Sequence, residues 1–182
     1  MKQGGEAMPA AGEEEMSVRT LEGRLDAGGL RFALVLPRFN DVFGQRLLSA
    51  AVDCLQRHGA KDEDLVIARV PGCFELPAAV RRLQDTHKVD AVIALGVLIR
   101  GATTHYDQVA NEAARGLGDC SRQGGCPVAY GVVTAENQEQ ALERCGGKAG
   151  NRGWDAALAA MEMARLMATI DEEAKSGGSR RG

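Results

Sequence analysis

"VDAVIALGVLIRGATTHYDQVANEA", residues 89–113, joins an almost continuous apolar run to a helix-forming segment through a short polar stretch. An apolar run of this length, bounded by turn signals, is typical of a strand that is buried on both faces of a sheet. Thr104, with Asp107 three residues later, fits the capping box that begins a helix, so we expect a helix over about 104–121. The stretch therefore predicts one strand–helix unit of a parallel sheet.

The same alternation of strand and helix signals extends along most of the chain. Apolar runs predict four strands, at 30–36, 65–70, 89–99 and 126–133. The segments that follow them predict five helices, at about 41–58, 74–84, 104–121, 137–145 and 151–169. Strands that alternate with helices form parallel sheets covered on both faces, so we expect an α/β fold. Residues 17–29 are a candidate for one short edge strand.

The length of 182 residues predicts a single domain, which we place at 17–170. The flanking segments, 1–16 and 171–182, are rich in Gly, Ser, Glu and Arg and have little to bury. We expect both to be flexible tails.

Composition and charge argue against several classes of protein. The net charge is −3 and no basic cluster is present, so we expect no nucleic-acid partner. The longest apolar run, Ala91–Ile99, is much shorter than the ~20 residues that span a bilayer, so we expect no membrane partner. Residues 1–15 lack the apolar core of a signal peptide, and the five cysteines form no C-x-x-C pair. These features predict a cytoplasmic protein with reduced cysteines and no metal site.

The predicted strands end in "PRFND", "PGCFE", "RGATTH" and "AYGVVTAEN". Because the carboxyl ends of parallel strands share one rim of the sheet, where open α/β folds bind ligands, we expect these segments to converge. Three of the chain's seven aromatic residues, Phe39, Phe74 and Tyr130, lie in them. They are either core side chains or a flat wall for a planar ring, and their convergence favours the wall.

The third of these segments suits an anion. The first N–H groups of a helix have no internal partner and the helix dipole makes that end positive, so a phosphate fits beside Gly101, Ala102, Thr103 and Thr104. The same positive end favours neutral imidazole at His105, which can then accept and return a proton. An ordinary helix cap and a solvated histidine remain the alternative for these residues.

Other candidate groups are weaker. Glu75 fits a first-turn partner of a helix dipole as well as it fits a catalytic group. His58 and His87 are expected at a helix end and in a turn, in structural roles. The chain contains no P-loop, no G-x-G-x-x-G after the first strand and no G-x-S-x-G.

Longer motifs produce a specific resemblance. "RFND", "PGCFELP", "ALGVLIRGATTHYDQVANEAARG", "VAYGVVTAEN" and "ALERCGGKAGNRGWDAALAAMEMA" occur in this order. On these motifs, residues 17–168 resemble the lumazine synthase family. The resemblance implies a three-layer α/β sandwich with a central, mostly parallel four-stranded sheet flanked by helices, which is a flavodoxin-like topology.

The resemblance also implies a transferase of riboflavin biosynthesis. Such an enzyme condenses 5-amino-6-(D-ribitylamino)uracil with 3,4-dihydroxy-2-butanone 4-phosphate to 6,7-dimethyl-8-ribityllumazine, the penultimate step, and needs neither a metal nor an organic cofactor. The implied partners are these small molecules and further copies of the chain, arranged as pentamers with active sites between subunits. The compact "GGKAGN" at 146–151 is similar to that of relatives that build 60-subunit icosahedral shells.

The same motifs carry site residues over to this chain. The resemblance implies that Phe39 stacks on the pyrimidine and that His105 is the general base. It implies a wall for the ring and the ribityl chain, made of Cys73, Phe74, Glu75 and Ile99. It implies phosphate-binding backbone groups at Gly101, Ala102, Thr103 and Thr104. Finally, it implies three side chains from the neighbouring subunit, Tyr130, Arg144 and Arg152, of which Arg144 pairs with the phosphate. The family commonly has Phe at position 130 and Lys at position 152.

Two other functions compete with the enzyme. One is a non-catalytic shell that holds cargo, and the other is a module that stores a flavin or a lumazine. The joint presence of Phe39, Glu75, His105 and Arg144 favours the enzyme. A phosphoryl-accepting receiver domain would share the sheet topology, but the first strand here ends in "PRFND" rather than in an acidic pair.

Overall fold

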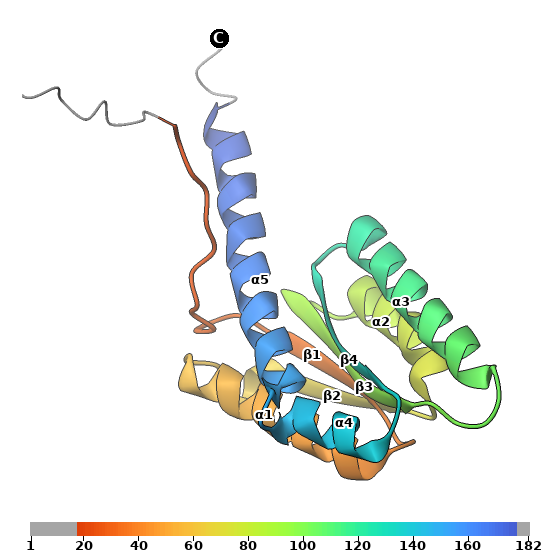
Figure 1. Cartoon of the computed structure of the whole chain (residues 1–182). Coiled ribbons are helices and arrows are strands. Elements are labelled where there is room, and N and C mark those ends of the chain that lie inside the picture. Colours follow the sequence, from red (N-terminus) through yellow and green to blue (C-terminus); the bar gives the residue numbers. More distant parts are fainter. Residues whose placement is uncertain (1–17, 178–182) are drawn as a thin grey trace, which may run out of the picture.

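The computed structural model describes residues 18–177, and a four-stranded sheet lies at its centre (Figure 1). The strands are β1 (Phe32–Pro37), β2 (Leu65–Val70), β3 (Ala91–Ile99) and β4 (Val128–Ala135). They lie in the order β2-β1-β3-β4, and every neighbouring pair is parallel. Two short strands, β5 (Cys145–Gly147) and β6 (Gly150–Asn151), form a separate antiparallel hairpin. The four predicted strands and their parallel arrangement are confirmed.

Helices cover both faces of this sheet, as the three-layer prediction requires (Figure 1). The helices α1 (Asp41–Arg57), α4 (Gln138–Arg144) and α5 (Arg152–Gly177) pack on one face. The helices α2 (Leu76–Thr86) and α3 (His105–Gln123) pack on the other. Single 3₁₀ turns, η1 (Asp62–Asp64) and η2 (Cys73–Glu75), precede β2 and α2.

The two inner strands explain why the predicted strands are apolar without alternation. In β1, Phe32, Leu34 and Leu36 face the core under α1 and α5, while Ala33 and Val35 face the core under α2 and α3. All six residues of β1 are buried, since successive side chains point to opposite faces and both faces are covered. The polar residues of this region are therefore confined to the strand ends.

The connections leave the sheet in two directions. The chain passes from β1 to α1 on one face, and from β3 to α3 on the other. Because β1 and β3 are neighbours, their two loops diverge at the carboxyl rim and leave a crevice between them. Open α/β sheets bind ligands in a crevice of this kind.

The candidate edge strand at 17–29 is wrong for the residues that the structure describes. Residues 18–31 form no strand and run beside α5 (Figure 1). Gly23 packs so closely on this helix that a Cβ there would lie 1.9 Å from the carbonyl oxygen of Glu162. The Arg165 Nε and Nη2 atoms donate to the carbonyl oxygens of Asp26 and Gly28, at 2.8 and 2.6 Å. Contact with the helix thus replaces pairing with the sheet.

The carboxyl-terminal tail also begins later than predicted. The last helix, α5, continues through residues 171–177, which the sequence predicts to be flexible. This stretch contains the strong helix formers Glu172, Glu173, Ala174 and Lys175, and no helix breaker precedes Gly177. The predicted tail 1–16 and the remainder of the other, 178–182, lie outside the described residues. Within 18–177, none of the helices combines the length and the apolar character needed to cross a bilayer.

The start of α5 gives a test of this packing. Gly153 lies against α1 so closely that a Cβ would be 2.0 Å from the carbonyl oxygen of Leu47. We expect Gly153→Ala to lower the free energy of unfolding by about 1–3 kcal/mol, because the two helices must separate. Urea denaturation at fixed protein concentration measures this loss.

A second glycine-to-alanine change is the control. At Gly118 in α3 the nearest atom to a new Cβ is the flexible tip of Arg122, at 3.2 Å. Gly118→Ala should leave stability unchanged or raise it by up to ~1 kcal/mol, through helix propensity. Equal losses for the two variants would contradict the close contact at Gly153.

Candidate active site

A pocket of about 680 Å³ opens at the carboxyl rim of the sheet. Three loops and the first turns of α3 form it, and the loop after β4 does not. Its lining residues are Phe39, Asn40, Pro71, Gly72, Cys73, Phe74, Glu75, Leu98, Ile99, Gly101, Thr103, His105, Tyr106, Gln108 and Val109. The predicted convergence on this rim is therefore confirmed for three of the four segments.

The loop after β1 holds an aromatic side chain out of the core. The backbone N–H of Phe39 donates to the Pro71 carbonyl at 3.2 Å, which ties this loop to the loop after β2. Asn40 follows with φ 59°, a left-handed conformation that asparagine tolerates, and its Nδ2 donates to the Val97 carbonyl at 2.9 Å. Phe39 is consequently 70% exposed, and Phe74 on the next loop is 55% exposed. Both rings belong to the pocket wall and not to the core.

The loop after β2 is closed by its own glutamate. The backbone N–H of Gly72 donates to Oε2 of Glu75 at 2.9 Å, and the N–H of Glu75 donates back to the Gly72 carbonyl at 3.3 Å. This reciprocal pair forms the single turn η2 and fixes the Glu75 carboxylate at the pocket wall. Glu75 is thus held by the loop and still lies where a ligand would meet it.

Cys73 lies deeper in the same wall. Its side chain is buried, and its sulfur packs on β3 where a Cβ on Gly96 would lie 2.8 Å from Sγ. Burial raises the pKa of the Cys73 thiol to about 12. The group is therefore an uncharged thiol at neutral pH, suited to packing and weak hydrogen bonding.

The loop after β3 presents unused backbone donors. None of the N–H groups of residues 101–105 donates a hydrogen bond to another group within residues 18–177. The α3 helix begins directly after them, with Asp107 N and Gln108 N donating to the Thr104 carbonyl. Free donors at the positive end of a 19-residue helix form an arrangement that binds anions.

The predicted capping box at this helix start is wrong, although the start itself is right. The Thr104 side chain makes no capping hydrogen bond, and its backbone is already helical, with φ −72° and ψ 0°. The carboxylate of Asp107 does not reach back to Thr104, because it is bound by Arg100.

Most of the predicted pocket residues do come together. Phe39, Cys73, Phe74, Glu75, Ile99, Gly101, Thr103 and His105 all line the pocket. Ala102 and Thr104 lie in the same loop but not on the pocket wall. The structure adds Asn40, Tyr106 and Gln108, which the sequence analysis did not single out. Helical spacing could have found Gln108, since it lies one turn after His105 on α3.

The three remaining predicted residues lie elsewhere. Tyr130 is the third residue of β4 and pairs with Ala94 near the middle of β3, so its predicted place on the carboxyl rim is wrong. The strand continues to Ala135, two residues beyond its predicted end at 133, so Tyr130 lies well inside it. Arg144 ends α4 and Arg152 begins α5, and both side chains are exposed away from the pocket.

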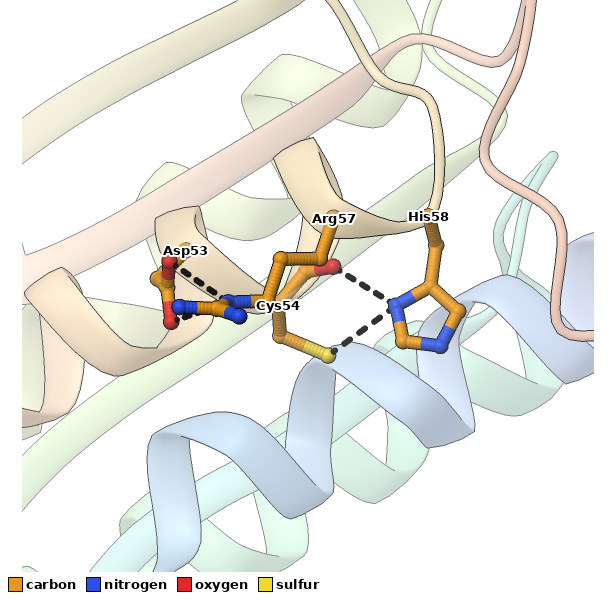
Figure 2. A network of polar contacts seen from close by, with 4 residues as sticks. All are labelled: Asp53, Cys54, Arg57 and His58. Carbon is orange, nitrogen blue, oxygen red and sulfur yellow. Dashed lines mark hydrogen bonds and ion pairs between the residues drawn. The ribbon is translucent and has the colours of Figure 1, made fainter.

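The other histidines have structural surroundings. Figure 2 shows Nδ1 of His58 directed at the carbonyl oxygen of Cys54, to which it donates at 2.7 Å across the end of α1. The His58 ring also meets the Trp154 ring edge-on, with 6.3 Å between centroids. The neighbouring Asp53 binds Arg57 instead (Figure 2). The structural role predicted for His58 is confirmed.

Within residues 18–177, no cluster of three His, Cys, Asp or Glu side chains could hold a metal ion.

Known proteins resemble this chain over most of its length. Residues 29–168 match the protein family described as 6,7-dimethyl-8-ribityllumazine synthase. Curated proteins of that name from Chlorobaculum tepidum and from Chlorobium phaeobacteroides strains BS1 and DSM 266 are 51%, 52% and 53% identical to the chain. Each match spans 151 residues, which is 83% of this chain and 97% of the relative.

The buried thiol of the pocket gives a prediction about reactivity. With its pKa near 12, Cys73 should carry about 1000-fold less thiolate at pH 8 than a thiol with the reference pKa of 9.0, so iodoacetamide should label it slowly. Mass spectrometry of the peptide that contains Cys73 measures the rate. In urea the rate should rise to that of an ordinary cysteine. Labelling of native Cys73 as fast as that of the half-buried Cys126 would contradict the assignment.

Proposed function

Because the chain belongs to the 6,7-dimethyl-8-ribityllumazine synthase family, we propose that it condenses 5-amino-6-(D-ribitylamino)uracil with 3,4-dihydroxy-2-butanone 4-phosphate. The products are 6,7-dimethyl-8-ribityllumazine, phosphate and water, and the reaction is the penultimate step of riboflavin biosynthesis. The observation that carries the proposal is a single pocket in which two exposed aromatic rings lie beside unused backbone donors at a helix start. One half suits a planar heterocycle, and the other suits a phosphate.

The heterocycle occupies the aromatic side of the pocket in this proposal. Phe39 stacks on the pyrimidine ring, and Phe74 and Ile99 add apolar wall. The Glu75 carboxylate accepts hydrogen bonds from the ribityl hydroxyls, while Cys73 packs against the ring without carrying charge. Phe39 is suited to this role because its ring is exposed and its backbone is tied to the neighbouring loop.

The phosphate of the butanone occupies the loop after β3. The backbone N–H groups of Gly101, Ala102, Thr103 and Thr104 receive its oxygens, and the positive end of α3 faces it. Gly101 has no Cβ and nothing lies within 4 Å of where one would be, so a ligand can approach the backbone there. His105 follows in the first turn of α3 and is exposed to the pocket.

The reaction needs several proton transfers between reactive partners. An amine of the uracil attacks the butanone carbonyl, and loss of water gives an imine. Elimination of phosphate, attack on the second carbonyl and loss of another water close the new ring. His105 accepts and returns the protons of these steps. Since both substrates are already reactive, holding them together accounts for much of the acceleration.

The pocket of one chain is incomplete for a phosphate ester. No lysine or arginine of residues 18–177 lines it, although a dianion is bound best with a cationic partner. Arg144, Arg152 and Tyr130 lie outside the pocket of their own chain, which supports the proposal that they complete the pocket of a neighbouring subunit. Arg144 then pairs with the leaving phosphate, while Tyr130 and Arg152 contact the other substrate. Tyr130 keeps the flat wall of the usual Phe, and Arg152 keeps the charge of the usual Lys with a different geometry.

This arrangement requires a homo-oligomer, for which we propose pentamers that build a 60-subunit icosahedral shell. The feature that supports the shell is the short β5–β6 hairpin, in which only Lys148 and Ala149 separate the paired residues Gly147 and Gly150. All five cysteines are free thiols, which supports the proposal that the protein works in the reducing cytoplasm.

The division of roles predicts an order of mutational effects. Arg144→Ala should reduce turnover more than His105→Ala, because stabilising the leaving phosphate affects the slow step while solvent can replace a proton carrier. We expect a loss of about 100-fold or more for Arg144→Ala. Lumazine absorbance follows the reaction from the two substrates, and a sample without protein corrects for uncatalysed condensation. A larger loss with His105→Ala would reverse the order. If the wild-type protein binds lumazine but does not form it faster than the sample without protein, it is a storage module.

Mixing experiments test whether the site is shared between subunits. One variant lacks the pocket residues Phe39 and His105, both changed to Ala, and the other carries Arg144→Ala. Co-assembly of equal amounts should restore about a quarter of the sites, because a wild-type pocket then meets a wild-type Arg144 at random. No gain over the separate variants, in oligomers shown to contain both, would contradict a site shared between subunits. Light scattering at micromolar concentration checks the assembly size, and pentamers or decamers alone would rule out the shell.

A further inference from the structure

Arg100 lies between the end of β3 and the proposed phosphate loop, and each nitrogen of its guanidinium contacts a carboxylate oxygen. Its Nε donates to Oε2 of Glu136 at 2.8 Å. Its Nη1 donates to Oδ2 of Asp107 at 2.9 Å, and its Nη2 lies 2.9 Å from Oδ1 of the same carboxylate. The planar guanidinium thus makes a bidentate contact with the Asp107 carboxylate and a single hydrogen bond, from Nε, with the Glu136 carboxylate.

The pair of Arg100 with Asp107 closes a loop that contains the proposed phosphate site. The two residues are seven positions apart, and between them lie the unused N–H groups and His105. The N–H of Arg100 also donates to the Ala135 carbonyl at 2.9 Å, which anchors the loop to the end of β4. The N–H groups of 101–105 make no hydrogen bond within residues 18–177, so the Arg100–Asp107 pair is a side-chain contact that spans the loop without using these donors.

The Arg100 guanidinium also packs on Tyr106, a residue of the pocket wall. Its central carbon lies 4.2 Å from the centroid of the Tyr106 ring, in a cation–π contact. Tyr106 lines the pocket, whereas Arg100 does not. Arg100 therefore contacts the wall, the loop and the β4–α4 connection without reaching the ligand space.

The charges indicate that Arg100 is not itself the missing phosphate ligand. Its single positive charge faces two carboxylates, those of Asp107 and Glu136, so the cluster is negative overall. The hydrogen bond from Arg100, the largest cause, holds the pKa of Asp107 below its usual range, so this partner stays ionised at neutral pH. A cluster of this kind orients backbone donors but gives a phosphate no free cation.

We propose that Arg100 is a positioning residue for the lumazine-forming reaction. Its bidentate contact with Asp107 fixes the proposed phosphate loop, and its cation–π contact fixes Tyr106. This rests on the proposed function of the pocket. Partly exposed ion pairs add little to global stability, so the effect belongs to the geometry of the site and not to folding. Removing either partner of the pair should have the same consequence.

Four variants separate this role from direct phosphate binding. Arg100→Gln and Asp107→Asn each release the loop and should lower kcat/KM for the butanone phosphate by about 10- to 100-fold, as expected for a misplaced site. Both should weaken inhibition by inorganic phosphate. The double variant should be no worse than either single one, because both changes break the same contact. Arg100→Lys keeps the charge but not the fork, and should recover only part of the activity.

The matched control is Arg57→Gln, which breaks the 2.9 Å pair of Arg57 with Asp53 on α1, far from the pocket. It should retain wild-type kinetics, and all variants should keep the melting temperature and assembly size of the wild type. If Asp107→Asn keeps or tightens phosphate inhibition while Arg100→Gln loses it, Arg100 binds the phosphate directly and the positioning role is wrong. The positioning role is also wrong if Arg100→Gln and Asp107→Asn show the same kinetics and phosphate inhibition as Arg57→Gln.

Failure of the proposed function would look different. In that case the wild-type protein itself would not accelerate lumazine formation, whatever the behaviour of its variants. The positioning role would then be tested by the binding of inorganic phosphate alone, measured by calorimetry. Weaker binding in both Arg100→Gln and Asp107→Asn than in Arg57→Gln would support it, and equal binding would overturn it.

Discussion

The burial of β1 and β3 on both faces is the constraint on which the rest of the structure depends. Strands covered by helices on each side can carry only apolar side chains, so every polar group near them is displaced to the strand ends. Because α1 and α3 leave these strands toward opposite faces, the loops after them separate and open the pocket. The position of the site is thus a direct consequence of how the core is packed.

Within that site, backbone geometry supplies what side chains do not. N–H groups without an acceptor lie at the start of α3, beside the pocket, and they can bind an anion together only if the loop holds them in one direction. Two carboxylates make comparable contacts at neighbouring loops: Glu75 closes its own turn, and Asp107 closes the loop after β3 through Arg100. The acidic residues Glu75 and Asp107 therefore shape the loops that line the pocket.

The absence of lysine and arginine from the pocket wall, among the described residues, connects chemistry to assembly. In the proposed function, this pocket offers a phosphate ester backbone donors but no cation from its own chain. The exposed arginines at the end of α4 and the start of α5 lie outside the pocket of their own chain. If a neighbouring subunit supplies them, catalysis and oligomerisation become one requirement, and a chain that cannot associate cannot turn over.

The sequence alone determined the four strands of the central sheet, the approximate start of each helix and the loops that carry Phe39, Cys73 and His105, because hydrophobic period and turn residues are local signals. It could not determine which distant partner a polar or marginal segment would choose. Residues 18–31 packed on α5 and not on a sheet edge, and Asp107 bound Arg100 and not Thr104. Tyr130 lies inside β4, paired with Ala94 of β3, and not on the predicted rim. Such outcomes depend on competition between contacts far apart in the chain, which only the tertiary structure resolves.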